Sequence, residues 1–117
     1  MHMVLEGRSN KKITASLISR FILKGIKATG MTLVLGPVIT KLPNGGLEGI
    51  AILAESHITV CADRHQYIYA DVFSCQPFNP EGILKLAQKL LGIKILKWER
   101  LNRGLEFLPK FAATSGH

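Results

Sequence analysis

The sequence predicts an α+β fold in which two helices pack on one face of a mainly antiparallel β-sheet, an α/β sandwich with the element order β-α-β-β-β-α-β. Two segments carry apolar residues at three- and four-residue spacing, which is the pattern of an amphipathic helix. The remaining segments alternate apolar and polar residues, as half-buried strands do. Residues 43 to 46 read PNGG, a turn composition that favours a hairpin between the strands on either side.

The two helical segments have recognisable ends. In residues 11 to 28 the isoleucine, leucine and phenylalanine side chains recur on one side, and Gly30 is a suitable stop. The second helix begins at residues 79 to 81, which supply a capping side chain, a proline and an acid near the positive end of the helix dipole. It ends at Gly92. Both helices are therefore expected to lay one apolar side on the sheet.

Five segments have the pattern of a strand, namely residues 4 to 5, 32 to 42, 47 to 54, 67 to 73 and 93 to 98. Beyond the third of these segments an apolar alternation continues at Ile58 and Val60. The fourth segment places Tyr67, Tyr69 and Phe73 on the face that the helices do not cover. Because an uncovered apolar face of this kind is unusual in a monomer, we expect a homodimer that buries it.

Composition limits the class of protein. With 117 residues, of which 47% are hydrophobic, we expect a single domain over residues 1 to 117. No basic stretch leads into a long apolar run, so we expect neither a signal peptide nor a membrane span and predict a cytoplasmic protein. The net charge is +7, but the basic residues are scattered, which favours a solvated surface over a nucleic-acid interface. Cys61 and Cys75 are expected to be free thiols, and no metal site is predicted.

Two central segments carry a resemblance to a known family. Residues 53 to 60 read LAESHITV and follow a hairpin turn, and residues 71 to 75 read DVFSC. The first segment resembles the self-cleavage segment of the prokaryotic S-adenosylmethionine decarboxylases, and the second resembles that family's Asp-x-Phe-(Ser or Thr)-Cys segment. Residues 2 to 6 fit the family weakly, so the resemblance extends over nearly the whole chain.

The resemblance implies a self-processing enzyme. The hydroxyl of Ser56 would attack the carbonyl of Glu55, and the ester so formed would eliminate to a dehydroalanine that hydrolyses to a pyruvoyl group. Cleavage would give a β chain of residues 1 to 55 and an α chain of residues 56 to 117. The pyruvoyl cofactor derived from Ser56 would then form a Schiff base with S-adenosylmethionine and accept electrons during its decarboxylation, a step of spermidine synthesis.

The resemblance also implies roles for other residues. Cys75 would return a proton to the substrate α-carbon, whereas without the resemblance it reads as a buried cysteine at a strand end. Glu55 is implicated by its place in the cleavage motif. Glu6 would face the substrate, although a lone glutamate in an N-terminal strand is more often simply solvated.

The sequence departs from the family pattern after the cleavage serine. The family has a histidine five residues later and then a Trp-Pro-Glu stretch whose glutamate binds ribose, whereas this chain has Cys61 and residues 62 to 65, ADRH. Cys61 would serve as an acid or base if Arg64 or His65 lowered its thiol pKa. A second interpretation is that His65 replaces Cys61 and binds substrate. The third is that Cys61 is a plain strand cysteine. Two alternatives to S-adenosylmethionine decarboxylation therefore stay open: the same chemistry on ornithine or arginine, and an unprocessed relative that binds a ligand or partner.

Overall fold

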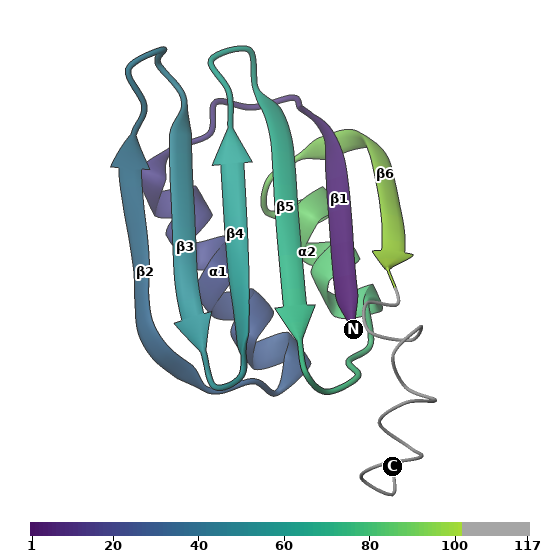
Figure 1. The fold of residues 1–117 in the computed structure, drawn as a ribbon. Coiled ribbons are helices and arrows are strands. Elements are labelled where there is room, and N and C mark those ends of the chain that lie inside the picture. Colours follow the sequence, from purple (N-terminus) through teal and green to yellow (C-terminus); the bar gives the residue numbers. More distant parts are fainter. Residues whose placement is uncertain (102–117) are drawn as a thin grey trace, which may run out of the picture.

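A computed structural model describes residues 1–101 of the chain. The elements are β1 (His2–Ser9), α1 (Ala15–Thr29), β2 (Leu33–Lys41), β3 (Leu47–Leu53), β4 (Ser56–Ala62), β5 (Tyr67–Ser74), α2 (Glu81–Lys89) and β6 (Ile93–Leu101). The strands form one sheet in the order β2-β3-β4-β5-β1-β6, and both helices lie on the same side of it (Figure 1). The predicted α+β class is confirmed, and each neighbouring pair of these strands is antiparallel.

The order of elements contains one more strand than the sequence pattern predicted. Ser56–Ala62 is a separate strand, β4, because Ala54 and Glu55 reverse the chain so that Leu53 pairs with Ser56. The expected continuation through Ile58 and Val60 was wrong, since the apolar alternation looks the same on both sides of this reversal. The turn also lacks the glycine, proline or asparagine that usually signals one. A second difference is that β1 spans His2–Ser9 and so extends beyond the predicted residues 4 to 5 at both ends.

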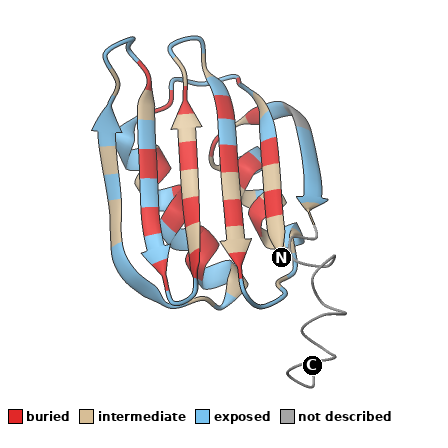
Figure 2. Cartoon of the chain, in the orientation of Figure 1, coloured by how far each residue is buried: buried red, intermediate tan, exposed pale blue. Residues whose placement is uncertain are grey.

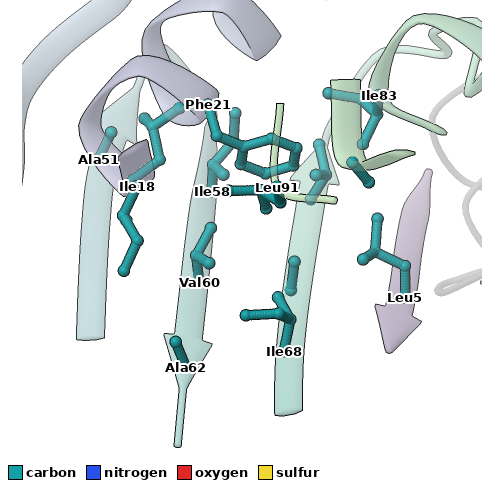
Figure 3. Packing of buried hydrophobic residues seen from close by; sticks show 14 of the residues in the cluster. Leu5, Ile18, Phe21, Ala51, Ile58, Val60, Ala62, Ile68, Ile83 and Leu91 are labelled. Atoms are coloured by element: carbon teal, nitrogen blue, oxygen red, sulfur yellow. The ribbon is translucent and has the colours of Figure 1, made fainter. Parts of the chain in front are cut away.

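The inner face of the sheet and the two helices enclose the core. Buried and less buried residues alternate along β3, β4 and β5, as Figure 2 shows. Phe21 of α1 lies beside Ile58 of β4, Ile18 lies toward Ala51 of β3, and α2 adds Ile83 (Figure 3). Burying such side chains stabilises the fold by roughly 1.5–3 kcal/mol each before the cost of ordering them.

Local signals set the helix ends and the depth of packing. Thr14 caps α1 by accepting a hydrogen bond from the Leu17 N–H at 3.2 Å, and Gly30 ends the helix with φ 73°. Asn79 accepts a hydrogen bond from the Glu81 N–H at 3.0 Å at the start of α2. On β3 a Cβ at Gly49 would lie 2.7 Å from Cγ2 of Ile18, so glycine allows α1 to approach the sheet closely.

The outer face of the sheet is not covered by any element within residues 1–101. Cross-strand partners share a face, so the register gives a row of Ile52, His57, Phe73 and His2 across β3, β4, β5 and β1. Exposed apolar side chains on this face include Leu35, Val38, Ile50, Ile52, Tyr67 and Tyr69. In this part of the chain no helix is long and apolar enough to cross a membrane. Residues 102–117, the end of the expected α chain, lie outside the described residues.

Candidate active site

The site begins at the turn between β3 and β4, where the sequence places the cleavage bond. Ala54 and Glu55 form a two-residue connection, and Ser56 opens β4 on the helix-covered side with 9% of its surface exposed. Glu55 itself is exposed and has a φ of 58°, in the left-handed region that favours glycine. A non-glycine residue held there costs on the order of 1 kcal/mol. The scissile bond of the sequence prediction therefore lies in a strained turn.

Cys75 follows the last residue of β5 and lies beside this turn. Its backbone N–H donates a hydrogen bond to the Glu55 carbonyl oxygen at 3.2 Å, and Ser56 is paired with Ser74 in the sheet. The Ser56 hydroxyl donates to the Ala54 carbonyl oxygen at 3.1 Å. The structure thus brings together three of the predicted residues: Glu55, Ser56 and Cys75. The interpretation of Cys75 as a buried strand-end cysteine was wrong, because the residue is exposed.

Cys61 lies at the far end of β4 and on the other face of the sheet. It is paired with Glu48 of β3 and Tyr69 of β5. It follows Ser56 by five positions along the strand, a span of about 16 Å. Within one chain the Cys61 thiol is therefore too distant to act on Ser56.

The electrostatic surroundings of Cys61 disfavour its thiolate. Partial burial raises the pKa of the Cys61 thiol, and the negative charges of Glu48 and Asp63 raise it further. The sequence left open that Arg64 or His65 lowers this pKa, and the direction found is the opposite. Arg64 instead donates from Nε to Nε2 of His65 at 3.2 Å.

His65 belongs to the turn between β4 and β5, at the end of β4 opposite Ser56. The Asp63 carboxylate organises this turn by accepting hydrogen bonds from the backbone N–H of His65 at 2.8 Å and of Tyr67 at 3.0 Å. Neither His65 nor Asp63 is near the predicted cleavage bond in the same chain.

Glu6 occupies a third location, on the outer face of β1. It is paired with Tyr69 and Lys97. Together with Asp71 and Glu99 it lines a hollow of about 400 Å³ over β5, β1 and β6. The five predicted positions other than Ser56 therefore fall into separate groups: Glu55 and Cys75 at the turn, Glu6 over β1, and Cys61 and His65 toward the opposite end of β4.

The sequence model of a family described as S-adenosylmethionine decarboxylase matches residues 3–104. This chain belongs to the S-adenosylmethionine decarboxylase family. Its fold is similar to the crystal structure of the adenosylmethionine decarboxylase from Aquifex aeolicus VF5, with a TM-score of 0.66 and 16% sequence identity over 84% of each chain. At that identity the likeness concerns the fold. A comparison with curated proteins gave no match.

In this S-adenosylmethionine decarboxylase family member, sequence reasoning missed two histidines, His2 and His57, which lie on the outer face near the β3–β4 turn. Nε2 of His2 lies 2.9 Å from Oδ1 of Asp71, and Nδ1 of His2 is buried without a partner in residues 1–101. The rings of His57 and Phe73 stack with centroids 5.4 Å apart. Position in the weakly matching segment 2 to 6 was the one signal for His2, because its approach to Asp71 depends on strand register.

The raised pKa of Cys61 predicts how its thiol titrates. In a Cys75→Ser background, replacement of Glu48 by Gln removes a negative charge, so the pKa of Cys61 falls and the midpoint of its alkylation by iodoacetamide moves to lower pH. The measurement is the pH profile of the alkylation rate, followed by mass spectrometry. Glu81→Gln on α2 is the control and leaves the profile unchanged; a Glu48→Gln profile identical to that control contradicts the assigned cause.

Proposed function

We propose that this chain is a self-processing, pyruvoyl-dependent decarboxylase that acts on S-adenosylmethionine in the cytoplasm and supplies spermidine synthesis. Cleavage between Glu55 and Ser56 divides its single domain into a β chain, residues 1 to 55, and an α chain, residues 56 to 117. Membership of the S-adenosylmethionine decarboxylase family supports the reaction. Two free cysteines within residues 1–101 fit a reducing compartment.

The single observation that carries the proposal is the hydrogen bond from the Cys75 N–H to the Glu55 carbonyl oxygen. When Oγ of Ser56 adds to that carbonyl carbon, negative charge develops on the carbonyl oxygen. A fixed backbone N–H aimed at this oxygen stabilises the charge, and one such donor is worth roughly 10²–10³ in rate in well-studied hydrolases. The Cys75 N–H thus polarises the Glu55 carbonyl group, whereas the sequence had implicated Cys75 through its thiol.

The processing chemistry balances within the chain and with water. The Oγ–C bond forms, the C–N bond between Glu55 and Ser56 breaks, and the hydroxyl proton moves to the released nitrogen. Elimination then transfers the Cα proton of residue 56 to a base, the Cα=Cβ double bond forms as the Cβ–Oγ bond breaks, and Glu55 leaves as a carboxylate. Water replaces the nitrogen of the resulting dehydroalanine, ammonia is released, and residue 56 becomes a pyruvoyl group.

The residues around position 56 fit such a group. Residue 56 is nine-tenths buried at the start of β4, is held by pairing to Ser74, and is beside the turn contacted by the exposed Cys75. When formed, a pyruvoyl ketone supplies an electron sink for an amino acid that loses carbon dioxide. Sheet pairing orients the new α-chain end, and Cys75 is the neighbouring thiol that donates a proton to the substrate α-carbon.

The base for the elimination step is the weakest part of the processing machinery. Cys61 stands where the family has a histidine, its pKa is raised, and about 16 Å of strand separates it from Ser56. Cys61 can contribute only if the thiol from one subunit reaches the cleavage turn of the other subunit in a dimer. We therefore infer that the ester eliminates slowly in this chain.

A second candidate function is decarboxylation of ornithine or arginine. The observation that favours it is the hydrogen bonding of Asp63, the one carboxylate in the segment where the family has its ribose-binding glutamate. Oδ1 of Asp63 is committed to two backbone N–H groups of its own turn. A carboxylate fixed in this way is less available to hydroxyl groups of a ribose.

We also propose a homodimer that buries the outer face of the sheet. Apolar side chains gather there over β2 and β3, with Ile50 43% and Ile52 45% exposed, and Tyr67 and Tyr69 continue the face over β5. Contiguous apolar surfaces of this kind mark interaction sites in soluble proteins. Cys61 and Glu6 lie on the same face, so a dimer is also the arrangement in which they can approach a cleavage turn.

The self-cleavage proposal predicts the masses of the purified chain. Because elimination lacks the family histidine, we expect intact protein together with two fragments that end and begin at the bond between Glu55 and Ser56. Hydroxylamine, which cleaves esters, raises the cleaved fraction, and Cys61→His speeds formation of the pyruvoyl-blocked α chain. Denaturing mass spectrometry measures all three. Ser56→Ala is the uncleaved control; a wild-type chain that stays whole with hydroxylamine and as Cys61→His argues for the non-catalytic, ligand-binding alternative.

Measurements of turnover test both the choice of substrate and the role of Cys75. Release of carbon dioxide is expected to be faster from S-adenosylmethionine than from ornithine or arginine, and the reverse order favours the second candidate.

Cys75→Ala retains its backbone N–H, so cleavage stays largely intact, while loss of the proton donor slows turnover by roughly 100-fold or more. Misplaced protonation then converts the pyruvoyl group to alanine. Wild-type turnover in Cys75→Ala removes this thiol from the mechanism.

A matched pair of variants tests the dimer proposal. Ile52→Lys places a charge on the outer face and is expected to yield a monomer by light scattering at micromolar concentration. Leu23→Lys on α1 is the control, because Leu23 is equally exposed, at 45%, and lies on the helical side. Its dimer stays intact. A wild-type protein with a strictly monomeric mass contradicts the proposal.

A further inference from the structure

We propose that the left-handed backbone of Glu55 is a strained element that accelerates rearrangement of its own peptide bond to Ser56, an inference that rests on the proposed self-cleavage. Within residues 1–101 only two residues other than glycine have positive φ, Glu55 at 58° and Gln66 at 70°. Glycine fills the other positive-φ positions, which are Gly30, Gly36, Gly45 and Gly92. The chain therefore has a disfavoured residue type at the bond that it is proposed to break.

The sheet prevents Glu55 from leaving this conformation. Leu53 and Ser56 on either side of the turn are paired with one another. The Ala54 N–H donates to the Thr32 carbonyl oxygen at 2.9 Å, and the Glu55 carbonyl oxygen accepts from the Cys75 N–H at 3.2 Å. Each end of the turn is thus tied to a different neighbouring segment, and φ of Glu55 cannot relax while these bonds persist.

The side chain of Glu55 does not account for the conformation. It is exposed and makes no hydrogen bond or ion pair with any residue from 1 to 101. What distinguishes position 55 is its backbone. Glu55 is therefore a positioning residue, which acts by presenting its carbonyl group and by storing strain, rather than a group that reacts through its carboxylate.

The rearrangement is the covalent step that releases this strain. It is an isomerisation: the Ser56 Oγ–C bond forms, the C–N bond breaks, and the hydroxyl proton passes to the nitrogen, with no further reactant. Once the C–N bond opens, Glu55 is attached through an ester and is no longer the middle of a backbone turn. Strain present in the folded precursor and relieved as this bond opens lowers the barrier between them.

The test compares substitutions at position 55 that differ in their tolerance of a left-handed backbone. The full-length chain is made by cell-free synthesis, and the intact fraction is followed with time by mass spectrometry. Glu55→Gly is expected to process about five-fold more slowly, which corresponds to about 1 kcal/mol of lost strain. Glu55→Asn falls between Gly and wild type, because asparagine tolerates this region better than most residues. Glu55→Gln and Glu55→Ala retain the strain and are expected to process faster than Glu55→Gly.

Gln66 provides the matched control, since it has the same type of backbone conformation in the turn at the opposite end of β4. Gln66→Gly is expected to process at the wild-type rate. Strain itself is measured in the uncleaved Ser56→Ala background, where Glu55→Gly raises the urea midpoint of unfolding relative to Ser56→Ala alone. A purely structural role of position 55 would not slow processing in a more stable protein.

Three outcomes overturn the inference. Processing of Glu55→Gly at the wild-type rate shows that the conformation does not drive the reaction. Glu55→Gln and Glu55→Ala as slow as Glu55→Gly show that the carboxylate is what matters. In both cases wild type is still cleaved, so the proposed function stands. A wild-type chain that is never cleaved refutes the proposed function and this inference together.

Discussion

Backbone pairing of β4 between β3 and β5 is the interaction on which both the fold and the site depend. It fixes Ser56 opposite Leu53 on one side and Ser74 on the other, so the residue after β5 meets the turn before β4. The hydrogen bond from Cys75 to Glu55 follows from this register. The same pairing sends Cys61 to the other end and the other face of the strand. One ladder thus decides which of the chemically interesting residues can meet within a single chain.

The sequence predicted the fold class because helical spacing and strand alternation are local signals. It predicted both helices and the side of the sheet that they cover, as seen in the burial of Ile18 and Phe21. It missed the reversal at Ala54 and Glu55, since alternation is unchanged when a strand turns back and neither residue is a usual turn former. The resemblance pointed to Ser56 and Cys75, which the structure places at the same turn. Neither local pattern nor resemblance gives register, and therefore the His2 contact with Asp71 and the separation of Cys61 from Ser56 became visible only in three dimensions.

The two faces of the sheet differ in burial and in the kinds of side chain that they carry. The core between the inner face and the helices is filled mainly by aliphatic side chains together with the Phe21 ring of α1, and Ser56 lies at its margin. The outer face combines exposed aliphatic residues on β2 and β3 with charged and aromatic residues on β5 and β1. Cys61 sits between these regions, where partial burial and two nearby carboxylates keep a thiol protonated. A reactive thiolate at this point would require the surroundings to change.

The strand order has a consequence for when the chain can react. β1 comes first in the sequence but lies between β5 and β6, so the proposed β chain is threaded into the sheet of the proposed α chain. A growing polypeptide cannot complete the contacts around Glu55 until residue 75 has left the ribosome, and β1 lacks its outer neighbour until β6 follows. The proposed self-cleavage would therefore occur only after synthesis has interleaved the two halves. Such a cut would remove a covalent link that the assembled sheet no longer needs to keep its halves together.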